Sequence, residues 1–595
     1  TITNSTILGN SKYGIYIYSS SSNYIYNNLL NNSVNIKFGG TIYQNNWNTT
    51  KQLGTNIYTN YYTYIGGNFY ANPNGTGYSE TCTDSDKDGF CDQPYELPDG
   101  NDSIENTDYL PLSTVPTKTI SSCSNLNQPG VTYFLTQDII NSTQSYCINI
   151  SANNITLDCQ GHLIDGNDSA EYGIIISRDS EETTNITIRD CTVTDWGAKA
   201  IYLKKADGNT LENLVVESNT YSNCRGIYLD YSDSNTLENI TANSNYYGIY
   251  LYHSHNNSLS NITANDNHKY DGAGIRLYYS DSNNLTNITA IGNAQGVWIY
   301  WSDFTILKNA ELINNTYFDI RYGTDRNAMD CHSQFINVTG TDNKPIVFFN
   351  SSIHIQNWNN NVSEIILCGA DYSTIDNLTM NHTDRKNNAL VLVATKYTNV
   401  TNSLFANLYY GIFVGYGEYQ PMYNRFVNIT VIDSYDLGIY LRGADSNTFE
   451  NISITCEGYG YGVDIYASWW NIFNKITVKN CNRGIWIWGG SKENNFTNLR
   501  VENNTYGICL FYSSNSNTIT NSTILGNSKY GIYIYSSSSN YIYNNLLNNS
   551  VNINFTGTIY QNNWNTTKQL GTRIYSAGNY IGGNYYTNPA GTGYS

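Results

Sequence analysis

Hydrophobic and polar residues alternate along most of the chain with a period of two. Ile240 and Ala242 are separated by a polar residue, as are Ile249 and Leu251. This period places alternate side chains on opposite faces of a β-strand, whereas a helical face repeats every 3.6 residues. The apolar runs are short and end in Asn, Ser or Gly turns, so the pattern predicts many short strands and almost no helix.

The alternating segments repeat one template. Asn-Ile-Thr-Ala is followed by Asn, then by Gly-Ile-x-Leu, and then by Ser and Asn-x-Leu, with copies that start at Asn239, Asn261 and Asn287. Successive copies are about 22 to 27 residues apart, which is a typical spacing for solenoids. A single repeat cannot bury its apolar face alone, so neighbouring repeats must stack.

The template predicts an all-β, right-handed parallel β-helix solenoid with three short strands per coil. A leucine-rich repeat has the same period but needs a denser leucine pattern and usually a helical return. Asn235, Asn257 and Asn283 recur at one corner and are expected to form side-chain ladders that satisfy turn backbone groups. The residues expected to face inward are Ile227, Leu229, Ile249, Leu251, Ile275, Leu277, Val297 and Ile299.

A longer repeat overlies the coils. Residues 1–55 and 518–572 differ only at Lys37 versus Asn554 and at Gly39 versus Thr556, which predicts tandem modules of ~517 residues. The expected domains are the C-terminal coils and tail of a preceding module (1–78), a calcium-binding loop segment (79–112), a linker (113–122), a cap that opens the β-helix (123–170), coils (171–320), irregular coils with protruding loops (321–385), and coils with a tail (386–595), in which 518–595 repeats 1–79.

An acidic motif between the modules has the spacing of a calcium loop. Asp84, Asp86 and Asp88 stand at positions 1, 3 and 5, the Phe90 carbonyl at position 7 and Asp92 at position 9. Hard oxygen ligands at this spacing favour Ca²⁺. The bidentate glutamate of an EF-hand is missing, so the motif is closer to thrombospondin type-3 or dockerin-like loops. A solvated acidic loop without metal is the alternative.

The twelve cysteines favour disulfides in an oxidising compartment over zinc, because none forms a CxxC pair. Cys82 and Cys91 flank the acidic loop and are expected to bridge it, and Cys159 and Cys191 occupy the same place in successive coils. Cys123 and Cys147 frame the cap and are also expected to be disulfide-bonded. The sequence leaves open the pairing of Cys224, Cys331, Cys368, Cys456, Cys481 and Cys509.

Glycosylation sequons are frequent, at roughly thirty Asn-x-Ser/Thr sites, a density typical of secreted chains. The Asn-Ile-Thr template creates some of them by itself. We expect N-linked glycans at several, among them Asn141, Asn185, Asn239, Asn337, Asn377 and Asn428.

The composition and net charge disfavour some classes of binding partner. The 595 residues carry a net charge of −18, which argues against nucleic acids and anionic membranes. No apolar stretch reaches the ~18 residues of a membrane-spanning helix. Only 13% of residues are charged, whereas 56 are Tyr. Aromatic residues at outward positions, such as Trp298, Tyr300, Trp486 and Trp488, would bind a sugar ring or another subunit, or simply stack on one another.

Hydrolysis of a polysaccharide would need two carboxylates about 5–9.5 Å apart on one outer face. The sequence has no adjacent Asp pair, and its seven His are dispersed. We therefore expect that the chain is not an enzyme.

Two segments resemble those of archaeal cell-surface proteins with NosD-like parallel β-helix repeats, a group also described as carbohydrate-binding and sugar-hydrolysis domains. They are the cap, which includes LDCQGHLIDG, and the tail, GGNFYANPNGTGYSETCTDSDKDG. With the coils, the resemblance covers nearly the whole chain, and it implies a secreted, glycosylated surface protein. The NosD name implies copper, but the Met/His/Cys cluster that soft copper needs is absent.

These features together predict a structural protomer of an extracellular filament, sheath or surface layer, for which adhesion is a further expected role. The near-identical modules favour self-association, with carbohydrate surfaces as further partners. The alternative is a secreted carbohydrate-binding or polysaccharide-cleaving β-helix protein.

The acidic loop generates the first testable prediction. If Asp84 and Asp88 hold structural Ca²⁺, millimolar Ca²⁺ should raise the melting temperature by about 2–5 °C over chelated protein. The double substitution Asp84→Asn with Asp88→Asn should remove this shift, and Glu212→Gln in a coil should keep it. Scanning fluorimetry with and without chelator measures the shift, and equal melting temperatures for the unsubstituted protein would contradict calcium binding.

Overall fold

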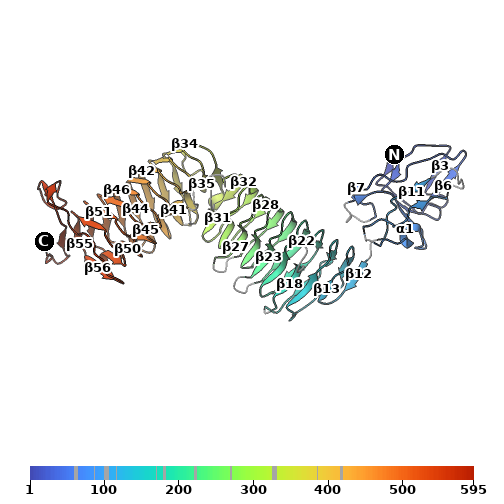
Figure 1. The fold of residues 1–595 in the computed structure, drawn as a ribbon, viewed down its shortest axis with the longest axis horizontal. Helices are drawn as coiled ribbons and strands as arrows, with labels where there is room; N and C mark the ends of the chain where they lie inside the picture. Colours follow the sequence, from blue (N-terminus) through green and yellow to red (C-terminus); the bar gives the residue numbers. More distant parts are fainter. Residues whose placement is uncertain are drawn as a thin grey trace. The chain divides into compact units, whose positions relative to one another are not determined.

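The structure is a computed structural model whose described part forms two compact units (Figure 1). Unit 1 comprises Thr1–Ile139, Ile148–His162 and Arg178–Cys191, and unit 2 comprises Ile140–Cys147, Leu163–Ser177 and Thr192–Ser595. The structure describes residues 1–58, 64–85, 88–98, 106–114, 117–168, 170–177, 183–219, 224–267, 271–323, 331–384, 386–415 and 420–594.

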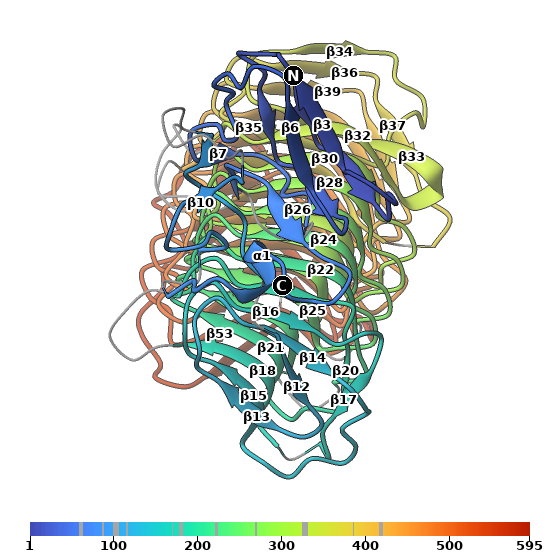
Figure 2. The ribbon, with the colours of Figure 1, turned by 90° about the vertical axis from the view of Figure 1, so that its right-hand side faces the viewer.

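Unit 2 is a stack of coils whose equivalent strands pair in parallel, as the sequence predicts. Figure 2 shows strands of one face, such as β22, β24 and β26, following one another along the stack. These belong to a series of hydrogen-bonded strands with the bounds β22 (Thr210–Glu217), β24 (Thr236–Thr241), β26 (Ser258–Thr263), β28 (Asn284–Thr289), β30 (Ile306–Glu311) and β32 (Gln334–Gly340).

A second face of the coils carries the Gly-Ile-x-Leu strands. The first stack on this face is β18 (Tyr172–Ser177), β21 (Lys199–Lys204), β23 (Arg225–Asp230), β25 (Tyr247–Tyr252), β27 (Ala273–Tyr278), β29 (Gln295–Tyr300) and β31 (Phe318–Gly323). The second stack is β35 (Glu364–Cys368), β38 (Asn388–Val393), β41 (Tyr410–Gly415), β43 (Leu437–Arg442), β45 (Tyr461–Tyr466), β47 (Arg483–Trp488), β50 (Tyr506–Phe511), β53 (Tyr530–Tyr535) and β56 (Ile553–Thr556).

The core follows from the period of two. Ile227 pairs in register with Ile249, and Ile249 pairs with Ile275, so one inward column runs through successive coils. All eight residues predicted to face inward are fully buried. Farther along, four phenylalanines stack at ring-centroid distances of 4.7–4.8 Å inside the solenoid: Phe426, Phe449, Phe473 and Phe496.

The three predicted strands per coil are often joined into two. β24 continues through Asn239, which has φ of 54°, whereas Asn498, with φ of 56°, separates β48 (Asn495–Thr497) from β49 (Arg500–Glu502). Asn adopts this left-handed conformation more easily than most residues and turns the chain sharply. The corner is therefore the predicted one, but strand pairing resumes directly after it in some coils.

The predicted asparagine ladder is present at the buried corner. The Asn235 backbone N–H and side-chain amide both donate to Asn257 Oδ1, at 2.8 and 3.1 Å, and the Asn257 backbone N–H donates to Asn283 Oδ1 at 2.8 Å. All three residues are at most 1% exposed. Each amide thus satisfies buried turn groups that would otherwise lose hydrogen bonds on burial.

The template is interrupted between the two stacks. β32 turns through a short 3-10 helix, η2 (Thr341–Asn343), into the antiparallel β33 (Lys344–Phe349). Asp319 lies at the repeat's glycine position, buried, and accepts hydrogen bonds from Asn315, Thr341 and Asn387 side chains. These donors satisfy a carboxylate that burial alone would make costly.

Unit 1 contains the first copy of the module end. β2 (Thr6–Leu8), β5 (Leu29–Asn31) and β9 (Phe69–Ala71) form a parallel sheet. It is followed by α1 (Tyr78–Thr81), the one α-helix among the described residues, and by the antiparallel pair β10 (Tyr95–Glu96) and β11 (Thr107–Asp108).

The ladder generates a stability prediction at Asn471. Its Oδ1 accepts from the Asn447 backbone N–H at 2.9 Å, and its amide donates to Asn494 Oδ1 at 3.0 Å. Asn471→Ala should lower the free energy of unfolding by about 2–4 kcal/mol, because it leaves several buried groups without partners. Urea unfolding measures the change, and Asn482→Ala, at a half-buried asparagine, is the control. Equal losses in both variants would contradict a special role for the ladder.

Candidate functional site on the outer face

The outward side chains of the first stack form an aromatic and cationic column. Tyr228 pairs in register with Tyr250, and Arg276 pairs with Trp298. We call Tyr202, Tyr228, Tyr250, Arg276 and Trp298 the aromatic platform. Arg276 lies over the Trp298 ring, with its guanidinium carbon 3.9 Å from the ring centroid. Cation–π contacts of this kind stabilise the face internally.

Most of the platform is closed to solvent. Tyr202, Tyr228 and Tyr250 are each less than 10% exposed, and Lys199 lies 4.0 Å above the Tyr202 ring centroid. Burial lowers the pKa of Lys199 to about 8. The rings therefore pack largely on each other and on the cations, and only the Trp298 end is half-exposed.

A carboxyl group stands among outward aromatic residues of the second stack. Asp464 lies on β45, in register with Tyr440 on β43 and with Trp486 on β47. Its carboxylate accepts a 2.7 Å hydrogen bond from Trp488 Nε1, and the residue is 4% exposed. Trp486 and Trp488 are stacked, with ring centroids 4.7 Å apart.

A second carboxyl influences the first. The pKa of Asp464 is raised to about 7, chiefly by burial and in smaller part by the charge of Asp436, whereas the Trp488 hydrogen bond and Arg483 oppose the rise. Asp436 directly precedes β43, and burial raises its pKa while a hydrogen bond from Tyr409 lowers it. We call Asp436, Asp464, Arg483, Trp486 and Trp488 the Asp464 site.

Two donors of this site are buried without an acceptor among the described residues. They are Arg483 Nη1 and the indole Nε1 of Trp486. The Arg483 guanidinium carbon lies 3.9 Å from the Trp486 ring centroid, which fixes both groups on one face. Buried donors without partners are uncommon and costly, so the site favours a ligand that supplies acceptor oxygens.

The Asp464 site has the components of acid–base chemistry on a sugar. A carboxyl with a pKa near 7 is protonated in about half of the molecules at neutral pH, and the protonated form can donate its proton to a leaving oxygen. A neighbouring carboxylate can act as base or nucleophile. Aromatic rings bind the apolar faces of sugars, and guanidinium and indole N–H groups bind hydroxyl oxygens.

The four aromatic residues that the sequence places at outward positions are half-exposed. The carboxyl pair, by contrast, was not predicted from the sequence. Trp298, Tyr300, Trp486 and Trp488 all lie at outward positions. Asp436 and Asp464 come from successive coils and are therefore not adjacent in the sequence. The available signal was an Asp at an outward position of the period-two pattern, with a second Asp one coil earlier.

The acidic loop does not assemble a cation site from its described residues. Asp84 accepts from the backbone N–H groups of Asp88 and Gly89, and Asp88 Oδ2 is 2.6 Å from Lys51 Nζ. Asp92 accepts from Ser85, Phe90 is buried, and Asp86 lies outside the described residues. In the part of the chain that the structure describes, no group of three His, Cys, Asp or Glu could hold a metal. Calcium binding stays a prediction.

The structure places ten cysteines in disulfides and leaves two free. Cys224 and Cys509 are free and buried, with thiol pKa values that burial raises to about 12. Cys123 and Cys147 are both disulfide-bonded. The bridges with described geometry are Cys82–Cys91, Cys159–Cys191, Cys331–Cys368 and Cys456–Cys481.

The six named sequon asparagines share one environment. Each is exposed and has a positive φ at a coil corner. The side chains of the five other than Asn141 belong to an outer ladder, in which, for example, Asn239 Nδ2 donates to Asn213 Oδ1 at 3.1 Å. Glycosylation stays a prediction for Asn141, Asn185, Asn239, Asn337, Asn377 and Asn428.

Fold and sequence together define a right-handed parallel β-helix protein. A right-handed β-helix family model matches residues 172–344. The model described as periplasmic copper-binding protein (NosD) matches residues 1–75, 336–521 and 423–591, more than half of the chain. The chain therefore belongs to the NosD family. Among the described residues, no helix is long and apolar enough to cross a membrane.

The family description mentions copper, but the described residues of this chain do not fit a copper site. Soft copper sites need clustered Cys, Met or His ligands. Among the described residues, no group of three or more His, Cys, Asp or Glu could hold a metal, and the two free cysteines, Cys224 and Cys509, are buried. We derive no chemistry through copper.

Similar solved structures include proteins that act on polysaccharides. A GH87 α-1,3-glucanase catalytic domain in complex with nigerose is 12% identical, with a TM-score of 0.31, over 59% of this chain and 67% of that one. A periplasmic alginate epimerase is 12% identical, with a TM-score of 0.25, over 59% and 81%. The Dettilon tailspike protein is 12% identical with a TM-score of 0.26, and the match spans 63% of this chain and 59% of the tailspike chain. No curated protein matches the chain.

The expectation that the chain is not an enzyme is contradicted by these matches, which include a glycoside hydrolase and an epimerase. Asp436 and Asp464 lie close enough for the charge of one to raise the pKa of the other. At 12% identity the matches assign neither a reaction nor a substrate to this chain.

The raised pKa of Asp464 generates a prediction on stability. The folded state keeps the proton up to about pH 7, whereas an unfolded Asp releases it near pH 4, so folding loses stability as pH rises between these values. Asp464→Asn removes the charge and keeps an acceptor for Trp488. It should gain up to about 4 kcal/mol relative to the unsubstituted protein at pH 8, and little at pH 4.

Urea unfolding at pH 4, 6 and 8 measures this difference. Glu238→Gln, at an exposed residue, serves as the control and should show no such pH dependence. A pH-independent difference between Asp464→Asn and the unsubstituted protein would contradict the assignment.

Proposed function

We propose that this NosD-family chain is a carbohydrate-active β-helix protein that binds a polysaccharide across the Asp464 site. One observation carries the proposal: a buried carboxyl with a pKa near 7 lies beside a second carboxyl and two unpartnered buried donors. In this proposal Asp464 is the proton donor and Asp436 its charged partner. Trp486 and Trp488 bind a sugar ring, and Arg483 binds a hydroxyl oxygen.

Charge and burial support a carbohydrate over a charged ligand. The site holds one cation and two carboxyls, so an anionic ligand would meet repulsion from Asp436. A neutral polysaccharide supplies hydroxyl oxygens for the donors and apolar ring faces for the indoles. It also places its glycosidic oxygen where a protonated carboxyl can act.

The structural role expected from the tandem modules is a separate question. The filament, sheath or surface-layer protomer rests on the sequence repeat and on no contact between chains. Self-association and glycans stay predictions. The disulfides and the periplasmic description of the family agree with a location outside the cytoplasm.

The test measures binding and cleavage of neutral polysaccharides by the whole chain. Trp486→Ala should weaken binding about tenfold, because it removes a stacking surface. Asp464→Asn should retain binding and lower the release of reducing ends by about 10²–10⁴-fold. The kcat/KM of the unsubstituted protein should fall as pH rises above about 7, since Asp464 then loses its proton.

Tyr459→Ala is the matched control, since this aromatic side chain is 84% exposed and lies outside the site. It should change neither binding nor cleavage. Binding without cleavage would support the binding role alone. No binding by the unsubstituted protein, or equal loss in Tyr459→Ala and Trp486→Ala, would overturn the proposal.

A further inference from the structure

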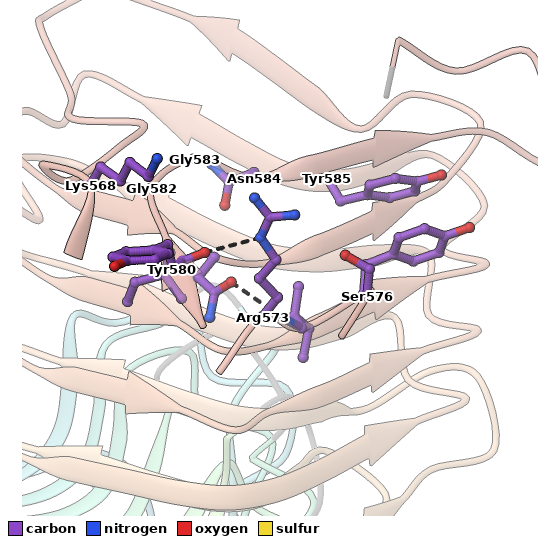
Figure 3. Close-up of a pocket in the computed structure, with 12 residues that line it drawn as sticks. Lys568, Arg573, Ser576, Tyr580, Gly582, Gly583, Asn584 and Tyr585 are labelled. Carbon is purple, nitrogen blue, oxygen red and sulfur yellow. Dashed lines mark hydrogen bonds between the residues drawn. The ribbon is translucent and has the colours of Figure 1, made fainter. Parts of the chain in front are cut away.

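An open cleft lies near the C-terminal end of unit 2 and is lined, among others, by Lys568, Arg573 and Tyr580 (Figure 3). In unit 1 the equivalent surface is covered by described residues of the segment 80–114, which hydrogen-bond to it. The equivalent of that covering segment would come after Ser595, so the openness of the cleft says nothing about a ligand. The outer face of the first stack is independent of the chain ends.

This outer face carries a row of positive side chains that share aromatic rings. Lys199 Nζ and the Arg225 guanidinium carbon lie 5.3 and 4.5 Å from the Tyr228 ring centroid. The guanidinium carbons of Arg225 and Arg276 lie 5.1 and 4.9 Å from the Tyr250 ring centroid. We call Lys199, Arg225 and Arg276 the cationic row. All three are half-buried, so their charged ends are held in place and still reach the surface.

None of the three cations has an ion pair with a carboxylate among the described residues. By contrast, Arg189 in a neighbouring coil pairs with Asp158. The carboxylate of Asp230 lies on the same face as the row, but it accepts a 2.8 Å hydrogen bond from the Tyr202 hydroxyl instead. In a chain with a net charge of −18, three neighbouring cations without such a partner indicate a binding site for an anion.

Repulsion between the cations raises the free energy of the unliganded face. Lys199 and Arg225 lie in register on the adjacent strands β21 and β23. Burial, followed by the charge of Arg225, lowers the pKa of Lys199 to about 8. The Nε atoms of Arg225 and Arg276 also find no acceptor among the described residues. A bound anion would offset the repulsion and accept hydrogen bonds from the guanidinium groups.

The second stack shows the same arrangement with its negative charge built in. Arg483 lies over the Trp486 ring much as the row lies over Tyr228. The residue in register with Trp486 on the preceding coil is Asp464, and Arg483 lowers the pKa of that carboxyl. The residue in register with Tyr228 on the preceding coil is Tyr202. On the first stack, therefore, a ligand has to supply the negative charge.

The shape of the face favours a linear sugar chain. The row runs along the stack, in which successive coils are ~4.8 Å apart, so it matches a polymer with negative charges at short, regular intervals. β23 and β25 each pair with a strand on both sides, which leaves no free backbone edge for a peptide. Trp298 and Tyr278, both half-exposed beside Arg276, offer apolar surface to sugar rings.

We propose that the cationic row binds an acidic polysaccharide, whose sugars carry carboxylate or sulfate groups, along the first stack. Lys199, Arg225 and Arg276 hold its anionic groups, and Trp298 packs on a sugar ring at one end of the row. The proposal is independent of the Asp464 site, which lies on the second stack and is proposed to bind a neutral polysaccharide.

The first test measures binding of an oligogalacturonate to the whole chain by isothermal titration calorimetry at low ionic strength. We expect saturable binding that weakens as salt is added, because salt screens the charges. The same oligosaccharide with its carboxyl groups reduced to alcohols should not bind at this site. A sulfated oligosaccharide measured in parallel distinguishes carboxylate from sulfate as the preferred anionic group.

Substitutions in the chain locate the site. Lys199→Gln and Arg225→Gln should each weaken binding at least about tenfold, and Arg225→Lys should retain more affinity than Arg225→Gln because it keeps the charge. Lys308→Gln is the matched control, since Lys308 is exposed on β30 in another sheet. Trp486→Ala should also leave this binding unchanged, so that failure here and failure of the Asp464 site can be told apart.

Proton uptake separates ligand contact from a purely structural role of Lys199. Besides burial, Arg225 and Lys204 lower the pKa of Lys199, whereas Asp230 and Glu171 raise it. A bound anion should raise this pKa above about 8, so binding should take up a proton and weaken as pH rises above that value. Calorimetry in buffers of different ionisation enthalpy measures the uptake, and Lys199→Gln should abolish it.

Three results would overturn the proposal. They are equal binding of the carboxyl-reduced oligosaccharide, equal binding of polyglutamate or single-stranded DNA, and affinity that survives both Lys199→Gln and Arg225→Gln. Melting temperatures of the variants show that they fold, and Arg225→Lys keeps the comparison valid if the Arg225→Gln variant does not.

Discussion

In-register pairing between successive coils is the constraint on which the whole solenoid depends. Each Gly-Ile-x-Leu strand bonds to its equivalent in the next coil, so a slip of one residue would turn Ile249 outward and its neighbours inward. Two devices oppose such a slip. Asn257 bonds to the equivalent asparagines before and after it, and Gly248 lies so close to the next coil that a Cβ would be 2.6 Å from the Gly274 carbonyl oxygen. Both features work only in one register.

The same constraint leaves the outward positions free to hold side chains of different chemistry. Inward positions must be apolar and of similar size, whereas an outward position can hold Tyr440, Asp464 or Trp486 in successive coils without disturbing the core. The stacked backbone then fixes their spacing, which is the rigidity that a site with an unusual pKa requires. The hydrogen bond from the Trp488 indole partly offsets the free-energy cost of burying Asp464. The remaining cost lowers the net stability of the folded solenoid.

The core and ladder positions depend on local periodicity and can be predicted from the sequence. Contacts between side chains of coils that differ in length cannot. Ile249 and Asn257 follow from the repeat alone, and both lie where the pattern places them. Asp436 and Asp464 are brought together by the length of the intervening coil, and the pKa of Asp464 depends on rings that cover it. No motif encodes that burial.

A solenoid end needs selectivity as well as cover, since an apolar cross-section alone would accept many partners. Asp108 shows how the first copy achieves this. Burial raises its pKa to about 7, so its carboxylate is tolerated only where Asn68 and Tyr70 donate to it. A purely apolar segment in its place would leave those donors without acceptors and would lose more than it gained from contact area. The donors therefore act as a filter for one acidic segment, whereas the glycines beneath set how closely its backbone can approach.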